Sequence, residues 1–217
     1  MPRGRAARYS EQQDSILEHA ASLFAERGFQ GTSMLDLARA AGVSKALLYH
    51  YYEDKYQLLV AIAEGHIDRL TALTAEAESA TTEVHAQQSG MRLERLIQRF
   101  VEEYASARAH HQVLVQDIKY LDARDQSRIR DKERVVVAAV ARAITEDWPG
   151  LSGSKLDKPL SMLLFGMINW LFTWFREEGT LDYPALAKMV VALISGGLRD
   201  MERSHVLPEA LSPVAKR

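Results

Sequence analysis

The 217-residue sequence contains no cysteine. This absence excludes disulfide bonds, thiolate nucleophiles, zinc ribbons and iron–sulfur ligation. Prolines and glycines are also few, at 6 and 12, so long stretches run without a helix-breaking residue. With 47% hydrophobic and 26% charged residues, the composition is typical of a soluble globular chain and not of a disordered one. The length predicts one large domain or a small domain joined to a larger one.

Long hydrophobic runs are missing too. The longest one, residues 160–175, would span ~24 Å as a helix, which is less than the ~30 Å hydrocarbon core of a bilayer. Asn169 also lies inside it. We therefore expect a buried helix and no membrane partner. The first 13 residues lack the apolar core of a secretory signal, so a cytoplasmic protein is expected.

The chain has no large excess of charge of either sign, since its net charge is −2. Any attraction for nucleic acid must therefore be local. Residues 1–60 carry seven Lys and Arg and seven Asp and Glu side chains, and hence no net charge. A single copy should bind DNA weakly, and a dimer that presents two DNA-binding helices is the natural remedy.

All of the convincing hydrophobic periodicity is helical, which predicts an all-α fold. The first helix should begin at Ser10, where Ser10 and Gln13 have the spacing of a capping box, and it should stop at Gly28. The further expected helices run from about residue 54 to 79, and over 91–109, 110–121, 123–147, 158–178 (stopped by Gly179) and 184 to Gly196 or Gly197.

Two short helices follow Gly28. Thr32 or Ser33 can cap the first of them, and Gly42 ends it. Ser44 can then cap a third helix over residues 45–52. A helix, a tight turn with glycine and a second helix are the arrangement of a helix-turn-helix. We expect a helix-turn-helix domain over residues 1–55 (motif about 32–51), a larger helical ligand-binding and dimerisation domain over 56–204, a polar loop at 80–90 and a loose tail over 205–217.

The third short helix has two distinct faces. Because each residue of a helix turns ~100°, Lys45, Ala46, Tyr49 and His50 share one small or polar face. This face should stay outside, and one helix fits the major groove of B-form DNA, which is about 12 Å wide. The opposite arc, which can pack inward, holds Leu47, Leu48 and Tyr51.

The outer face can read DNA. Lys45 can donate to a phosphate or a guanine edge, and Tyr49 and His50 can donate to phosphates or present a ring to a thymine methyl group. The ordinary alternative is that both rings are half-buried core residues. Thr32 and Ser33 can hold a phosphate at the start of the preceding helix, and Lys55 can bind another phosphate. The N-terminal residues Arg3, Arg5 and Arg8 form either a DNA-contacting arm or a solvated terminus.

Residues 16–59 resemble the DNA-binding domain of the TetR family of bacterial repressors. The resemblance is carried by AASLFAERGF, the TS start of the second helix, LARAAGVSK, LYHYY and EDKYQLL. Tyr52 stands where phenylalanine is usual, so its hydroxyl needs a partner, and Met34 replaces a residue that is often polar. By this resemblance the groove-facing positions are Thr32, Ser33, Lys45, Ala46, Leu47, Tyr49, His50 and Tyr51, with Lys55 on a phosphate.

The resemblance also implies an all-helical homodimer with a variable ligand domain. The last two long helices, here about 158–178 and 184–196, would form a four-helix bundle between subunits. Residues 166–198 look like the end of regulators that sense acyl-CoA thioesters. Arg124, Arg128 and Arg130 would meet the CoA phosphates or form a solvated face. An effector pocket would be lined by Phe100, Tyr104, Tyr120, Met167, Trp170 and Trp174. The alternative is that these six side chains are ordinary core residues.

Catalytic and metal-binding patterns are missing. His110 and His111 are adjacent and point ~100° apart on a helix, which makes a poor metal pair, and His66 with Asp68 lacks a third ligand. No phosphate-binding glycine loop or nucleophile elbow occurs. We expect no enzyme, metal or cofactor. The leading hypothesis is a dimeric repressor that a small apolar or acyl-CoA effector releases from a palindromic operator. The alternative is a helical small-molecule-binding or scaffold protein without specific DNA binding.

Overall fold

The structure is a computed structural model that describes residues 3–79, 91–176, 179 and 181–204. Helices are the only regular elements of these residues, which confirms the all-α prediction. The loop predicted at 80–90 and the tail predicted at 205–217 lie outside the described residues. Among the helices that are described, none combines the length and the apolar character that a membrane span requires.

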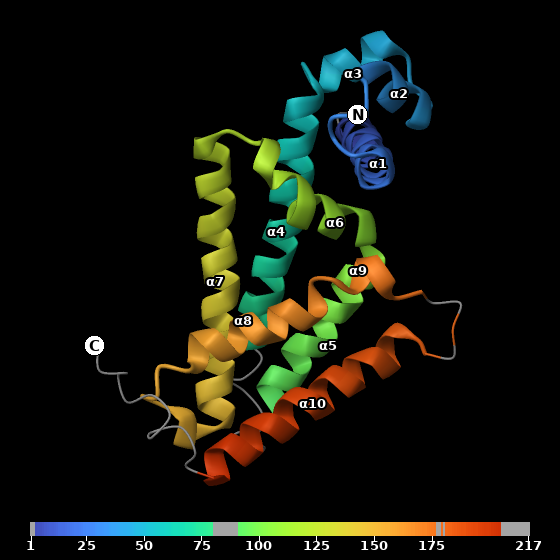
Figure 1. The fold of residues 1–217 in the computed structure, drawn as a ribbon. Coiled ribbons are helices and arrows are strands. Elements are labelled where there is room, and N and C mark those ends of the chain that lie inside the picture. Colours follow the sequence, from blue (N-terminus) through green and yellow to red (C-terminus); the bar gives the residue numbers. More distant parts are fainter. Residues whose placement is uncertain (1–2, 80–90, 177–178, 180, 205–217) are drawn as a thin grey trace, which may run out of the picture. The chain divides into compact units, whose positions relative to one another are not determined.

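The chain divides into two compact units, and Figure 1 labels the helices that belong to them. The first comprises residues up to 69 together with 107–132, and the second comprises 70–106 and the residues from 133 onward. The sequence-based limits at 55 and 204 stay a proposal. In chain order the elements are α1 (Arg3–Arg27), α2 (Met34–Ala40), α3 (Lys45–Tyr51), α4 (Lys55–Ser79), α5 (Met91–Ser106), α6 (Arg108–Asp117), the 3-10 helix η1 (Ile118–Tyr120), α7 (Ala123–Asp147), the 3-10 helix η2 (Pro149–Leu151), α8 (Asp157–Ile168), α9 (Leu171–Trp174) and α10 (Tyr183–Ser204).

The first helix starts earlier than the sequence predicted. It begins at Arg3 and not at Ser10, because residues 3–9 contain alanine and arginine, which favour helices, and no proline. Ser10 and Gln13 therefore make no capping box. Instead, the Gln13 amide donates a hydrogen bond to the hydroxyl of Tyr52, 3.2 Å away. The predicted end is confirmed, since Gly28 follows α1 with a φ of +77°.

The apolar helix predicted over 158–178 is broken. In the structure α8 ends at Ile168, and α9 begins at Leu171 after a turn at Asn169 and Trp170. The Asn169 side-chain oxygen accepts a hydrogen bond from the Tyr104 hydroxyl at 3.1 Å, so this polar side chain is satisfied from another helix. The prediction of one continuous helix was wrong because the helical spacing of apolar residues continues across the turn.

The last helix continues past the predicted stop. It runs through Gly196 and Gly197 to Ser204, and neither glycine has a positive φ. Leu198, directly after them, is buried. Burial of such a side chain is worth about 1.5–3 kcal/mol, which is enough to offset the roughly 2 kcal/mol that the two glycines together cost in a helix. The predicted helix over 123–147 matches α7, and the one over 110–121 is divided between α6 and η1.

Candidate nucleic-acid interface

The start of α2 is fixed by a capping box. The Ser33 hydroxyl accepts a hydrogen bond from the backbone N–H of Asp36 at 3.2 Å, and the Asp36 carboxylate accepts one from the backbone N–H of Ser33 at 3.1 Å. Two hydrogen bonds lower the pKa of Asp36. The one from the Ser33 hydroxyl has the larger effect, and the one from the Ser33 backbone N–H has the smaller. Of the two candidate caps, Ser33 is therefore the cap, and its side chain is exposed.

Thr32 is turned inward. Its side chain is buried, and its hydroxyl donates to the backbone carbonyl of Gly28 at 2.9 Å. The hydroxyl therefore closes the loop that follows α1. A contact between Thr32 and DNA stays a prediction, and it would have to use the backbone at this position.

The turn between α2 and α3 requires glycine. Gly42 has a φ of +64°, in the left-handed region where glycine carries no steric cost. The backbone N–H of Val43 then donates to the carbonyl of Ala38 at 3.0 Å, which closes the end of α2. Ser44 caps α3 by accepting from the N–H of Leu47 at 3.1 Å. Local sequence alone therefore sets where α3 begins.

One side of α3 faces the core. Leu48 is fully buried, and Tyr52, directly after the helix, is buried with its hydroxyl bonded to Gln13. Burial raises the pKa of the Tyr52 hydroxyl. The expectation that the Tyr52 hydroxyl needs a partner is confirmed. Tyr51 is half-buried, as expected for the inner arc.

The other side of α3 is exposed. Tyr49 is 44% exposed, and Lys45, Ala46 and His50 are exposed as well. This excludes the alternative that Tyr49 and His50 are core residues. The Lys45 ammonium lies 5.6 Å from the centroid of the Tyr49 ring, within cation–π range. Leu47 is exposed too, so its predicted inward packing was wrong, and of the predicted inner arc only Leu48 is fully buried, while Tyr51 is half-buried.

An aromatic cluster extends the exposed surface, and sequence reasoning missed one member of it. The Tyr9 ring from α1 lies 4.5 Å from that of Tyr51 and 6.5 Å from that of His50, between centroids. Tyr9 was missed because the helix was predicted to start at Ser10. Its spacing from Gln13, one helical turn further on, was the available signal. The early start of α1 also makes the backbone of the predicted arginine arm helical.

Lys55 is already bound within the protein. Its ammonium donates to the backbone carbonyls of Phe29, Thr32 and Gln30 at 2.8, 3.1 and 3.4 Å. It also lies 4.6 Å from the centroid of the Phe29 ring. Lys55 thus holds the loop between α1 and α2 against the start of α4. Its contact with a DNA phosphate stays a prediction.

The predicted effector residues are divided between the two units. Phe100 and Tyr104 stack in the core of the second unit with centroids 6.3 Å apart, and burial raises the pKa of Tyr104. Tyr120 belongs to the first unit, where it stacks on Phe29 at 5.4 Å. The other predicted residues of the second unit are the half-buried Met167 and the exposed Trp170 and Trp174.

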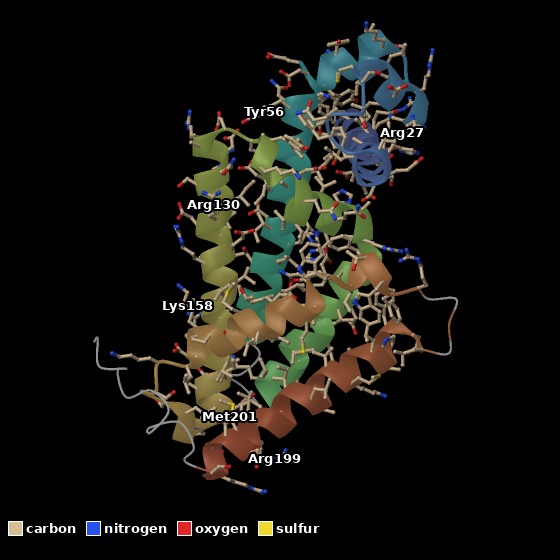
Figure 2. The ribbon with its side chains drawn as sticks, viewed as in Figure 1. Arg27, Tyr56, Arg130, Lys158, Arg199 and Met201 are labelled. Carbon is tan, nitrogen blue, oxygen red and sulfur yellow. The ribbon has the colours of Figure 1, made fainter. Side chains whose placement is uncertain are left out.

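The three candidate phosphate-binding arginines differ in their surroundings. Arg128 pairs with Glu64 and, at 2.9 Å, with Asp125. Arg130 extends from α7 (Figure 2) and donates to the Gln126 side chain at 2.7 Å. Arg124 is exposed. Arg128 makes close ion pairs with two carboxylates, and the charge of Arg124 helps to lower the pKa of Asp122. CoA binding by any of the three arginines stays a prediction.

Two family profiles match the chain. Residues 16–62 match the profile described as bacterial regulatory proteins, tetR family. Residues 86–198 match the profile described as tetracyclin repressor-like, C-terminal domain. The first match includes α2 and α3, and the second includes the residues from α5 into α10. Both profiles describe regulators, and neither describes an enzyme.

Individual proteins resemble nearly the whole chain. The HTH-type transcriptional repressor KstR2 of Rhodococcus jostii is 26% identical over 200 residues, which are 90% of this chain and 93% of the relative. A crystal structure of a TetR-family transcriptional regulator from Bordetella parapertussis is 31% identical, has a TM-score of 0.75 and covers 83% of this chain and 92% of its own. AibR, solved with isovaleryl coenzyme A and operator DNA, has the same fold, with a TM-score of 0.69 at 23% identity over 84% of this chain and 97% of its own.

Proposed function

Because the chain belongs to the tetR family of bacterial regulatory proteins, we propose that it is a dimeric repressor released from a palindromic operator by a small apolar or acyl-CoA-type effector. The observation that carries the DNA-binding part is the exposed face of α3, with Lys45, Tyr49 and His50 on a helix capped at its start and anchored by Leu48. A rigid helix with one free polar face is what major-groove recognition requires.

The proposed contacts fall into two groups. Lys45, Tyr49 and His50 contact base edges and nearby phosphates, while Ala46 permits close approach of the backbone. Ser33 supplies an exposed hydroxyl at the start of α2 for a phosphate. The proposed interface also includes Thr32, Leu47, Tyr51 and Lys55. Lys55 would act mainly by holding the loop between α1 and α2 in place.

In the proposed dimer, each copy of the chain would pack against the other through the unit that contains α8 and α10. Large apolar side chains are exposed on α8 and α10, where Leu163 is 65% and Leu193 is 67% exposed, together with Met162 and Met189. Exposed apolar surface of this extent marks a protein interface. A symmetric pairing of these two helices with those of a second copy would bury it in a four-helix bundle.

The effector would act through α4. This helix contributes residues to both units, so a shift in its position would change the spacing of the two α3 helices of a dimer. That spacing must match one helical turn of DNA, about 34 Å, or a multiple of it. The isovaleryl coenzyme A with which AibR was solved supports an acyl-CoA effector here. Phe100, Tyr104, Met167, Trp170 and Trp174 stay the proposed contacts, with Tyr120 in the first unit.

The DNA-binding proposal is tested by fluorescence anisotropy with duplexes from the region upstream of the coding sequence. Lys45→Gln and Tyr49→Ala should each weaken binding at least 10-fold, and Lys45→Gln should reduce the salt slope by about 1. Arg130→Gln, which removes an exposed cation from α7, is the matched control and should bind like the wild type. Unchanged affinity of both α3 variants would disprove the groove assignment.

A further inference from the structure

A cleft of about 320 Å³ lies between α4 and α5 in the second unit. Its wall on α4 is formed by Leu73, Glu76 and Ala77, which share one helical face because they are three and four residues apart. Its wall on α5 is formed by Arg95, Gln98, Arg99 and Glu102, which follow the same spacing. Both helices therefore turn a continuous stripe of side chains to the cleft, and the stripe on α4 is partly apolar.

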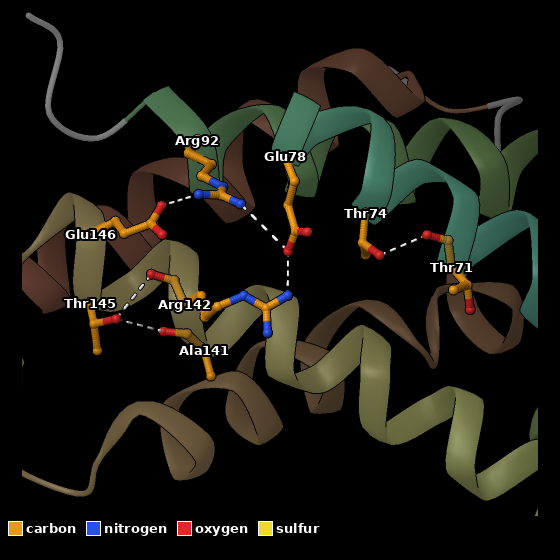
Figure 3. Close-up of polar contacts among 8 residues, drawn as sticks. All are labelled: Thr71, Thr74, Glu78, Arg92, Ala141, Arg142, Thr145 and Glu146. Carbon is orange, nitrogen blue, oxygen red and sulfur yellow. Dashed lines mark hydrogen bonds and ion pairs between the residues drawn. The ribbon is translucent and has the colours of Figure 1, made fainter. Parts of the chain in front are cut away.

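Most arginines near this cleft have carboxylate partners. Arg99 pairs with Glu76 at 3.1 Å across the cleft. Beyond the cleft, Arg92 lies between Glu146 and Glu78, the latter at 3.6 Å, and Arg142 pairs with the same Glu78 (Figure 3). In this part of the second unit an arginine is thus usually matched by a glutamate from another helix.

Arg95 departs from this pattern. Its side chain is half-buried, and its Nε atom is enclosed without a hydrogen-bond acceptor among the residues that the structure describes. The neighbouring Gln98 makes a different contact, in which its amide nitrogen donates to Glu94 at 3.2 Å. An enclosed donor without an acceptor costs free energy, and the cost is larger on a charged group. Within the described part of the chain the Arg95 guanidinium, unlike that of Arg99, also has no carboxylate partner, which leaves its charge available to an anion in the cleft.

We propose that this cleft binds the anionic group, a carboxylate or a phosphate, of a small molecule whose apolar part lies on Leu73 and Ala77. The planar guanidinium of Arg95 presents parallel N–H donors that match the oxygens of either group. The volume lies at the lower end of the range of small-molecule sites. The site goes beyond the proposed function, since Phe100 and Tyr104, the proposed effector contacts on α5, are buried in the core.

Glu102 limits what this site accepts. It is exposed and lies two helical turns beyond Arg95 on the same face of α5. Its carboxylate repels an anion in the cleft, so affinity for a simple anion should be low and should rise when this charge is removed. Glu102→Gln should therefore strengthen anion binding, whereas Arg95→Gln should weaken it.

Isothermal titration calorimetry on the full chain tests the site with octanoate, octyl phosphate and inorganic phosphate. At least one of the two amphiphiles should bind, Arg95→Gln should weaken that binding at least 10-fold, and Glu102→Gln should strengthen it about threefold. The stronger of the two amphiphiles identifies the preferred headgroup, and weaker binding of inorganic phosphate shows that the apolar wall contributes. Lys158→Gln, which removes an exposed cation that neither lines the cleft nor belongs to the proposed effector contacts, should bind as the wild type does.

Two results would overturn the proposal. Undiminished binding by Arg95→Gln would place the ligand elsewhere, for example at the proposed effector residues, and would leave the proposed function intact. A lower melting temperature of unliganded Arg95→Gln would show that Arg95 stabilises the fold and is not an unused donor. The expected result is little change in melting temperature, because the variant loses no hydrogen bond from Arg95 Nε to the described residues.

Discussion

His66 on α4 and His111 on α6 share a hydrogen bond in the core of the first unit, with His66 Nε2 3.1 Å from His111 Nδ1. Both rings are buried. A guanidinium nitrogen of Arg69 lies 3.2 Å from the other ring nitrogen of His66, and a guanidinium only donates. His66 Nδ1 is therefore the acceptor, its Nε2 carries the proton, and His111 Nδ1 accepts. This chain of donors and acceptors is complete when both imidazoles are neutral.

Replacing one of these histidines should cost more than its own contacts. His111→Leu leaves the His66 Nε2–H without its acceptor, which costs about 1–3 kcal/mol. The double variant His66→Leu, His111→Leu leaves no such donor, so its loss of stability should be smaller than the sum of the two single losses. Urea denaturation of the four proteins at neutral pH measures this coupling. Additive losses would show that the hydrogen bond contributes nothing to stability.

Asp117 should make the folded state more stable as the pH falls toward 4. Burial raises the pKa of this carboxyl, against the opposing charge of Lys119 and a hydrogen bond from the backbone N–H of Phe29. The folded state therefore binds the proton more tightly than the unfolded state. The resulting stabilisation is complete below the unfolded value of 3.8 and is lost as the pH rises through the folded pKa.

Asp117→Asn is the corresponding variant. It keeps an oxygen that accepts from Phe29 and removes the buried charge, so at pH 7 it should unfold at a higher urea concentration than the wild type, by an amount within about 2 kcal/mol. The difference between the two proteins should shrink as the pH approaches 4. A variant that is less stable at pH 7 would show that the carboxylate charge itself stabilises this site.

Tyr9 should support operator binding without contributing much to stability. Its ring is 46% exposed and packs on Tyr51, and it lies beside His50 on the surface proposed to meet DNA. Tyr9→Ala should weaken operator binding about 3- to 10-fold, because the two α3 rings lose their neighbour, and should change stability by less than about 1 kcal/mol. Tyr9→Phe keeps the ring and is expected to bind nearly as the wild type does. Equal binding by all three proteins would exclude a role for this cluster.

Leu193 should be required for dimerisation. It is 67% exposed on α10, and a glutamate in its place would put a charge into the proposed interface. Light scattering after size-exclusion chromatography should show a dimer for the wild type and a monomer for Leu193→Glu. Val135→Glu, an exposed apolar residue on α7, is the matched control and should remain dimeric. A dimeric Leu193→Glu would place the interface on another surface.

The sequence alone determined the parts of this protein that depend on neighbours in the chain. Ser33 and Ser44 cap their helices, and Gly28 and Gly42 end theirs, because each acts on backbone groups within a few residues. Helical periodicity also predicts that Lys45, Tyr49 and His50 face outward, because they lie on the polar face of α3 and not on the arc that holds the buried Leu48.

Tertiary structure decided the rest, because those features depend on residues far apart in the chain. The break after α8 places Asn169 against Tyr104, 65 residues away, and α10 passes two glycines because Leu198 is buried. Lys55 is bound by carbonyls 23 to 26 residues away, and His66 meets His111 at a separation of 45. Helical spacing predicts which face of a helix is apolar, whereas only packing decides which partner that face meets.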